Sequence, residues 1–177
     1  MILFNKWKNG IVASLTAGAV ITFCLAIFVP VTQAEQPYDI TSCHSGTIKT
    51  LYSSKEMTIL SGEGWGIITS NHENKAFDNC TFHVMTLIQV MGEKITETGY
   101  YKLMDPDGDL VIAETTRIGT ESISRFLHGT GKYKGITGGG KSQRIVFGRI
   151  PPNTAAACSR SVGTFKLPKP LRIFIYS

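Results

Sequence analysis

Six polar or aromatic side chains lie in the middle of segments that otherwise have the composition of β-strands. They are Glu63, Trp65, His83, Tyr100, Glu114 and Arg117. A histidine in such a place can act as a base or as a ligand. If the six side chains face a common interior, they form a ligand-binding pocket with a few polar groups in an apolar wall. A lone histidine on a strand is also a common structural residue, and the alternation of these segments leaves the direction of the side chains open.

A second candidate is the glycine-rich stretch His128–Ser142, HGTGKYKGITGGGKS, which matches the phosphate-binding pattern G-x-x-x-x-G-K-[ST] at residues 135–142. That pattern holds phosphates only where a strand enters the loop and a helix leaves it. The residues that follow, Ser142 to Gly148, are rich in β-branched and aromatic types and precede two prolines. They predict a strand, so we interpret the glycines as a turn and expect no nucleotide ligand.

The run Asp105-Pro106-Asp107-Gly108-Asp109 has the carboxylates of a calcium loop. An EF-hand loop needs glycine at its sixth position and glutamate at its twelfth. Here glycine is fourth and the twelfth position is Thr116. Aspartate, proline and glycine are also the usual residues of a hairpin turn, so we favour a turn and expect no metal and no cofactor.

The first 34 residues have the features of an export signal. Lys6 and Lys8 give a basic start, Ile11 to Val31 carries no charge, and Thr32-Gln33-Ala34 places small residues at a cleavage site. Cleavage after Ala34 leaves residues 35–177, the length of one domain. The alternative is an uncleaved anchor, since the uncharged run is long enough to cross a bilayer, and this is the only membrane contact we expect. We predict an exported protein, periplasmic or extracellular.

Charge and cysteine content follow from that cleavage. The formal charge of the whole chain is +5, and loss of the two signal lysines lowers it without leaving any basic block, so we expect no nucleic-acid partner. The mature chain keeps Cys43, Cys80 and Cys158, which in an oxidising compartment indicate one disulfide and one free thiol. In an up-and-down order of strands, Cys43 and Cys80 each begin a strand at the same end, whereas Cys158 precedes the last strand at the other end. We therefore predict the pair Cys43–Cys80.

Eight segments favour β-strand and none has a helical period. They are residues 44–52, 57–69, 80–91, 94–104, 110–118, 121–129, 141–150 and 161–167. Turn signals such as Gly92-Glu93 and Gly119-Thr120 separate them at short intervals. Glycines at 62, 64 and 66 leave one face of the second segment bare, which indicates strong curvature. The pattern predicts an all-β protein, an antiparallel sandwich or barrel.

Within this pattern Gly129-Thr130-Gly131-Lys132-Tyr133, with Gly135 and Gly138, forms G-T-G-x-aromatic-x-G-x-x-G between two strands. Together with residues 62–66 and 105–109, it resembles the allene oxide cyclase/dirigent-like barrel superfamily and its small bacterial members, over most of residues 43–167. The resemblance implies an eight-stranded antiparallel barrel, allene oxide cyclase-like (calycin-like), spanning residues 35–177. Relatives are often homo-oligomers, and their cavities hold apolar or phenolic molecules. From the glycine turn, Tyr133 and Ile136 are expected to plug one end of the barrel.

Three functions remain open at this point. The first is a binding protein for a small apolar or aromatic molecule, and the second is an isomerase or cyclase that confines a reactive, lipid-like substrate. The third is an interaction or inhibitor module with a filled core. A smooth apolar cavity favours the first, paired ionisable groups in a cavity favour the second, and a solid interior favours the third. No serine–histidine–acid or cysteine–histidine motif is present, so we assign no catalytic residue and leave open whether the protein is an enzyme. The apolar residues 171–176 could cap the barrel, pair with an edge or contact a second subunit.

Overall fold

The computed structural model describes residues 34–150 and 153–168, with the side chains of 149 and 150 left aside. The predicted signal and the apolar C-terminal segment fall outside these ranges. The strands are β1 (Gln36–Ser53), β2 (Thr58–Ser70), β3 (Thr81–Met91), β4 (Lys94–Met104), β5 (Leu110–Ile118), β6 (Glu121–Gly129), β7 (Thr137–Ile150) and β8 (Thr154–Lys166), with a 3₁₀ turn η1 (Gly131–Tyr133) between β6 and β7. Within the described residues no helix is long and apolar enough to cross a bilayer.

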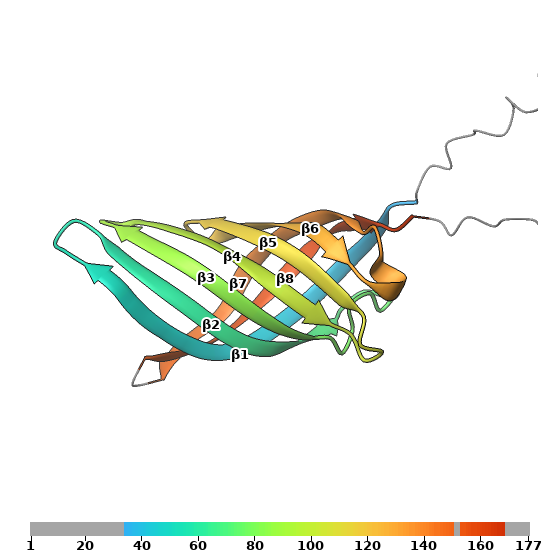
Figure 1. Cartoon of the computed structure of the whole chain (residues 1–177), viewed down its shortest axis with the longest axis horizontal. Coiled ribbons are helices and arrows are strands. Elements are labelled where there is room, and N and C mark those ends of the chain that lie inside the picture. Colours follow the sequence, from blue (N-terminus) through green and yellow to red (C-terminus); the bar gives the residue numbers. More distant parts are fainter. Residues whose placement is uncertain (1–33, 151–152, 169–177) are drawn as a thin grey trace, which may run out of the picture. The chain divides into compact units, whose positions relative to one another are not determined.

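Each strand pairs antiparallel with the next, and β1 also pairs with β8, so the sheet closes into a barrel (Figure 1). The predicted eight-stranded antiparallel barrel is confirmed. Closure leaves no free sheet edge along the paired segments, which removes the aggregation hazard of an open sheet.

The bare glycine face of β2 lies inside the barrel, where Gly62 and Gly64 line the interior. Opposite them on β1, a Cβ atom at Gly46 would lie 2.1 Å from the carbonyl oxygen of Glu63. Only glycine allows this close approach of the two backbones, so the glycines mark the concave face of a strongly curved sheet. The residues between them, Glu63 and Trp65, therefore face outward.

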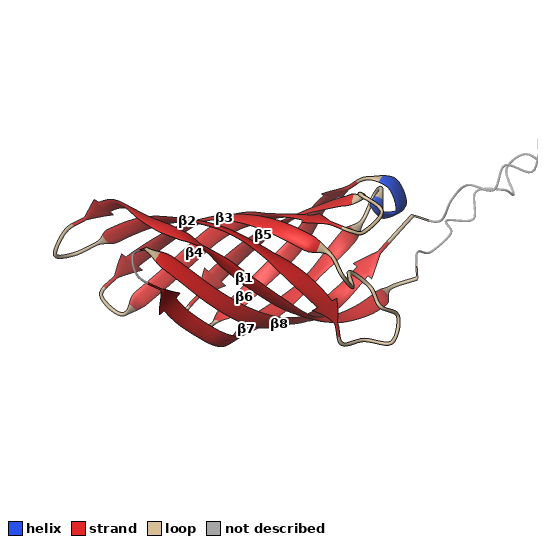
Figure 2. Ribbon diagram, turned by 90° about the horizontal axis from the view of Figure 1, so that it is seen from below, coloured by secondary structure: helices blue, strands red, loops and turns tan. Residues whose placement is uncertain are grey.

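One end of the barrel is closed by an aromatic core. Phe77, in the loop between β2 and β3, is 2% exposed; its ring stacks on Tyr133 and lies edge-on to Tyr38, with centroid distances of 5.7 and 5.5 Å. Tyr133 and Ile136 are buried in this cluster, as expected from the glycine turn. Figure 2 shows η1 at the same end. The loop between β2 and β3 thus supplies the centre of the plug.

The glycine stretch and the aspartate turn both have structural roles here. β7 begins at Thr137, so the Gly-Lys-Ser of the phosphate-loop match lies on a strand and no helix follows it, as predicted. In the β4–β5 turn the Asp105 carboxylate accepts hydrogen bonds from the backbone N–H groups of Asp107 and Asp109, each 2.9 Å long. Lys132 forms ion pairs with the carboxylates of Asp105 and Asp107. These contacts tie the predicted turn to η1.

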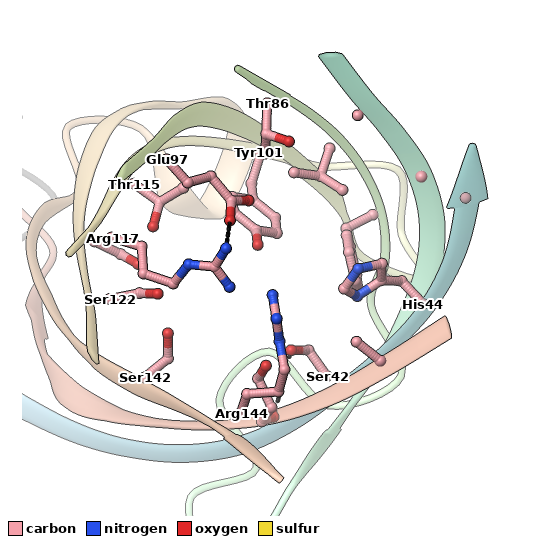
Figure 3. Close-up of a pocket in the computed structure, with 18 of the residues that line it drawn as sticks. Ser42, His44, Thr86, Glu97, Tyr101, Thr115, Arg117, Ser122, Ser142 and Arg144 are labelled. Carbon is pink, nitrogen blue, oxygen red and sulfur yellow. Dashed lines mark hydrogen bonds and ion pairs between the residues drawn. The ribbon is translucent and has the colours of Figure 1, made fainter. Parts of the chain in front are cut away.

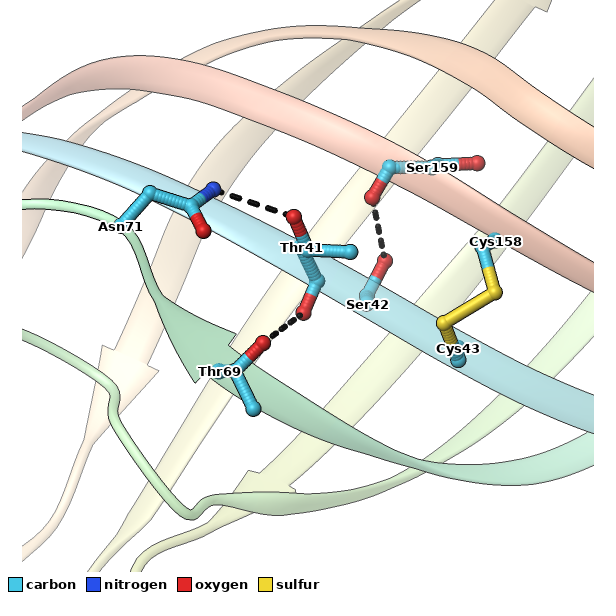
Figure 4. The surroundings of a disulfide bond; sticks show 7 residues. All are labelled: Thr41, Ser42, Cys43, Thr69, Asn71, Cys158 and Ser159. Carbon is cyan, nitrogen blue, oxygen red and sulfur yellow. Dashed lines mark hydrogen bonds between the residues drawn. A yellow bond between two sulfur atoms is a disulfide. The ribbon is translucent and has the colours of Figure 1, made fainter.

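The disulfide prediction was wrong. Cys43 bonds to Cys158 (Figure 4). Cys80 is a free, buried thiol. The prediction placed Cys43 at the start of the first strand and Cys158 before the last, but β1 already begins at Gln36 and β8 at Thr154. Both cysteines are thus in mid-strand, and closure of the barrel pairs them directly across the β1–β8 ladder.

Candidate functional site

The barrel encloses a cavity of about 320 Å³ lined by residues from all eight strands (Figure 3). From the aromatic plug it extends toward the opposite end, which we call the hairpin end because the turns after β1, β3 and β5 lie there. Along β3 the inward side chains pass from Phe82 and Val84 at the plug, through Thr86, to Ile88 and Val90 toward the hairpin end. Most other strands repeat this order of an aromatic or apolar plug and a polar middle, followed on β1 to β4 by an apolar rim, whereas the middle of β2 is bare glycine.

The polar middle layer, which we call the polar belt, is drawn in Figure 3. It consists of Ser42, His44, Thr86, Glu97, Tyr101, Thr115, Arg117, Ser122, Ser142 and Arg144. Glu97 and Arg117 are cross-strand partners on β4 and β5, and their side chains form an ion pair of 2.5 Å. Only 14% and 12% of these two side chains are exposed. The pair therefore lies at the wall of the cavity and has little contact with bulk water.

Arg144 enters the belt from β7 and points toward the middle of the cavity, facing Arg117 (Figure 3). Its guanidinium carbon lies 4.9 Å from the ring centroid of Phe147, within range of a cation–π contact. Arg144 is only partly desolvated there and keeps exposed surface, so water and ligands can reach it. With two guanidinium groups and one carboxylate, the belt carries an excess of positive charge.

This charge and the burial of the belt shift the pKa values of its members. Burial, then the charge of Arg117, lowers the pKa of Arg144, which remains cationic as arginines do in proteins. Burial, then the charge of Arg144, lowers the pKa of His44. Burial, then Glu97, raises the pKa of Tyr101 to about 12. At neutral pH the cavity thus presents a neutral imidazole, a phenol that can donate a hydrogen bond, and two cations.

The apolar rim lies on the hairpin side of the belt. It comprises Ile48, Leu60, Ile88, Val90 and Ile95. Within the described parts of the chain, no group of three histidine, cysteine, aspartate or glutamate side chains is placed to hold a metal ion. An apolar rim over a cationic belt suits an organic molecule with an apolar body and a polar end.

Of the six candidates from the sequence, Arg117 alone has its side chain in the polar belt. Trp65 and Tyr100 are 55% and 60% exposed on the outer surface. His83 stacks on Trp65 with centroids 5.1 Å apart, and its Nε2 lies 2.8 Å from Oε1 of Glu63. These side chains share the outer face of β2 to β4.

Glu114 also faces outward, where it pairs with Arg125 at 2.7 Å. The structure therefore does not bring the six predicted residues together. The belt residues that the sequence reasoning missed include His44, Glu97, Tyr101 and Arg144. The position of Glu97 could have been predicted from the sequence. A tight turn at residues 105–109 pairs Met104 with Leu110, and counting outward from that pair sets Glu97 opposite Arg117.

Comparisons with known proteins agree with this architecture. Among solved structures, the pterocarpan synthase dirigent protein GePTS1 matches with a TM-score of 0.50 and 8% sequence identity, over 77% of this chain and 94% of that one. The fold is that of a dirigent-like barrel. The attachment invasion locus protein Ail of Yersinia pestis, in complex with sucrose octasulfate, is also matched, with 10% identity over 77% of this chain and 100% of that one, but its TM-score of 0.17 supports no argument. No protein-family model matches the sequence, and no curated protein is significantly similar to it.

At 8% identity the dirigent-like match establishes the architecture and nothing about chemistry. Of the predicted resemblance, this match therefore shows the dirigent-like fold alone. Any function has to be argued from the cavity and its polar belt.

Proposed function

We propose that the protein is an exported barrel that binds a small molecule with an apolar or aromatic body inside the cavity. The observation that carries this proposal is the layered interior, in which a closed aromatic plug, a polar belt and an apolar rim surround about 320 Å³. That volume is at the lower end of the usual range of ligand pockets, roughly 300–1,000 Å³. The Cys43–Cys158 disulfide supports export, since such bonds persist mainly in oxidising compartments.

The rim and the belt would contact different parts of the ligand. Aliphatic side chains such as Ile48 and Ile88 would remove water from the ligand's apolar body, a gain of roughly 25 cal/mol for each Å² buried. The polar belt would orient the ligand's polar end through a few placed donors. A module with a solid core is not supported, because this interior is not filled.

Binding is tested with N-phenyl-1-naphthylamine, a neutral probe whose fluorescence rises in apolar surroundings. Ala155 lines the cavity, whereas the next residue on β8, Ala156, faces the other side of the sheet. We expect Ala155→Trp to abolish the fluorescence rise and the matched control Ala156→Trp to leave it unchanged, with both variants showing the wild-type circular dichroism spectrum. Equal binding by the two variants would place the probe outside the cavity and refute the proposal. Native mass spectrometry of protein purified without added ligand would identify a retained compound.

A second candidate function is an isomerase or cyclase that uses the same cavity. Paired ionisable groups were the feature expected of such an enzyme, and Glu97 and Arg117 form such a pair beside Tyr101. These groups could stabilise charge as a confined molecule rearranges. Incubating the retained compound with wild-type protein and with Glu97→Gln, followed by chromatography, separates the two functions. A pure binding protein returns the compound unchanged, whereas an isomerase yields a new peak of equal mass that the variant forms more slowly.

A further inference from the structure

The charges of the belt do not balance among the described residues. Arg117 is neutralised by Glu97 at 2.5 Å. Arg144 has no carboxylate within 4 Å among the side chains that the structure describes, and the ionic charges that act on its pKa are Arg117, which lowers it, and the already paired Glu97, which raises it. The lowered pKa of Arg144, caused by burial and then by Arg117, has the sign expected for a cation in an unfavourable place.

Other donors line the same cavity as this uncompensated cation. The Nε–H of Arg117 is buried and has no hydrogen-bond partner in the described part of the chain. The Tyr101 hydroxyl, whose pKa is about 12, remains protonated at neutral pH and lies in the same belt. Ser142 lies on β7 near Arg144 and also faces the cavity. A positive charge and several donors thus lie in one belt, and the one carboxylate of that belt is already paired.

We infer that the ligand is an amphipathic organic anion whose single acidic group, a carboxylate or sulfonate, is bound by Arg144. A planar guanidinium matches such a group with two parallel, charge-assisted hydrogen bonds. The acidic group lies in the polar belt, and the apolar body lies against the apolar rim toward the hairpin end. This inference rests on the proposed function and adds to it the chemical class of the ligand.

Two probes that share a ring system test the inference. 8-Anilinonaphthalene-1-sulfonate carries the sulfonate that N-phenyl-1-naphthylamine lacks. We expect wild-type protein to bind the sulfonate more tightly than the neutral probe. Arg144→Gln is expected to weaken sulfonate binding about 10-fold or more while changing neutral-probe binding less than about 2-fold, because only the sulfonate loses a charge-assisted bond. Arg144→Lys keeps the charge and is expected to retain part of the affinity.

The matched control is Arg125→Gln, which removes an arginine from the outer face of β6, where 70% of the side chain is exposed. It is expected to leave the binding of both probes unchanged. Ala155→Trp is expected to block both probes, which places them in the cavity.

Each other outcome is decisive. If Arg144→Gln leaves sulfonate affinity unchanged, or weakens both probes equally in a folded protein, the anion inference is wrong and the proposed cavity binding still stands. If sulfonate binding survives Ala155→Trp, the probe binds elsewhere and the inference is also wrong. If wild-type protein binds neither probe, the proposed function itself fails.

Discussion

The buried ion pair of the polar belt offers the sharpest test of this interior. Glu97→Gln keeps the size of the side chain but removes its charge, so Arg117 stays buried without its partner and faces a second cation, Arg144. Removing one member of a buried pair typically costs about 3–5 kcal/mol, because the remaining ion keeps its desolvation penalty and loses its attraction. The cavity adjoins the pair and could admit some water, so we expect a loss near the lower end, about 3 kcal/mol in the free energy of unfolding.

The outer pair Glu114–Arg125 is the matched control. It joins the same residue types at 2.7 Å, but its side chains are 36% and 70% exposed. Exposed pairs are screened by water and contribute about 0.2–1 kcal/mol, so Glu114→Gln should lie within that range. The double variant Glu97→Met with Arg117→Met removes both buried charges and is expected to recover most of the loss, since apolar replacement of a buried pair is often neutral or stabilising.

The assay is urea unfolding of the oxidised protein, followed by circular dichroism, for all three variants and the wild type. A change of midpoint with an unchanged slope reports a change of stability alone. The reasoning is refuted if Glu97→Gln costs no more than Glu114→Gln. It is refuted as well if the double variant is less stable than Glu97→Gln, because the cost would then come from packing and not from an unpaired charge.

The variant Glu97→Gln should also change the pKa of His44. Burial and then the charge of Arg144 lower the pKa of His44, and the Glu97 carboxylate acts in the opposite direction. Glu97→Gln should therefore lower this pKa further, which proton NMR of the imidazole measures directly. Because the unfolded state binds more protons than the folded state below the ordinary histidine value of 6.5, His44 destabilises the fold as the pH falls through 6.5 toward its lowered folded-state pKa. An imidazole that titrates at or above 6.5 in the folded protein would contradict this account.

Three further predictions concern the frame of the barrel. Cys158→Ser opens a cross-link spanning 115 residues and should cost roughly 4–5 kcal/mol, measured by urea unfolding, while non-reducing peptide mapping of the wild type should recover Cys43 joined to Cys158. Cys80 is 1% exposed and burial raises its pKa to about 11, so Ellman's reagent should label it only after denaturation; rapid labelling of native protein would contradict its burial. Gly46→Ala places a methyl group 2.1 Å from a backbone oxygen and should lower the free energy of unfolding, measured in urea, by about 2 kcal/mol or more. Gly148→Ala, with open space around its Cβ position, should change that free energy by less than about 0.5 kcal/mol.

Local sequence patterns were sufficient to predict the bounds of the strands that lie between tight turns. The bounds of β4, β5 and β6 follow from turn residues at both ends, and the structure has the same bounds. The first and last strands were predicted too short because their outer halves, around Gln36–Cys43 and Thr154–Arg160, are polar or alanine-rich. These halves become strands by pairing with each other when the barrel closes, a contact between the two ends of the domain that no local pattern reports.

The candidate site was harder to predict because a shift of one residue moves every side chain of a strand to the other face. Trp65 and Glu63 were considered for the interior, although the glycines between them already occupy the crowded concave side. Taking those glycines as inward would have fixed the face of β2 and, through the hairpin, that of β3. Arg144 gave no such signal, since a β-bulge between Arg144 and Val146 interrupts the alternation of β7.

The fold and the polar groups of the cavity therefore depend on different residues of this chain. The glycine turn carries the sequence resemblance to other barrels, and its aromatic residue Tyr133 belongs to the core that plugs one end. The polar groups of the cavity lie in mid-strand positions such as Glu97 and Arg144, which the closed sheet holds in one belt. A sequence with the same turns could change these positions and keep the fold. A relative with the same glycine turn but an apolar residue in place of Arg144 should accordingly keep the barrel and lose the preference for anions.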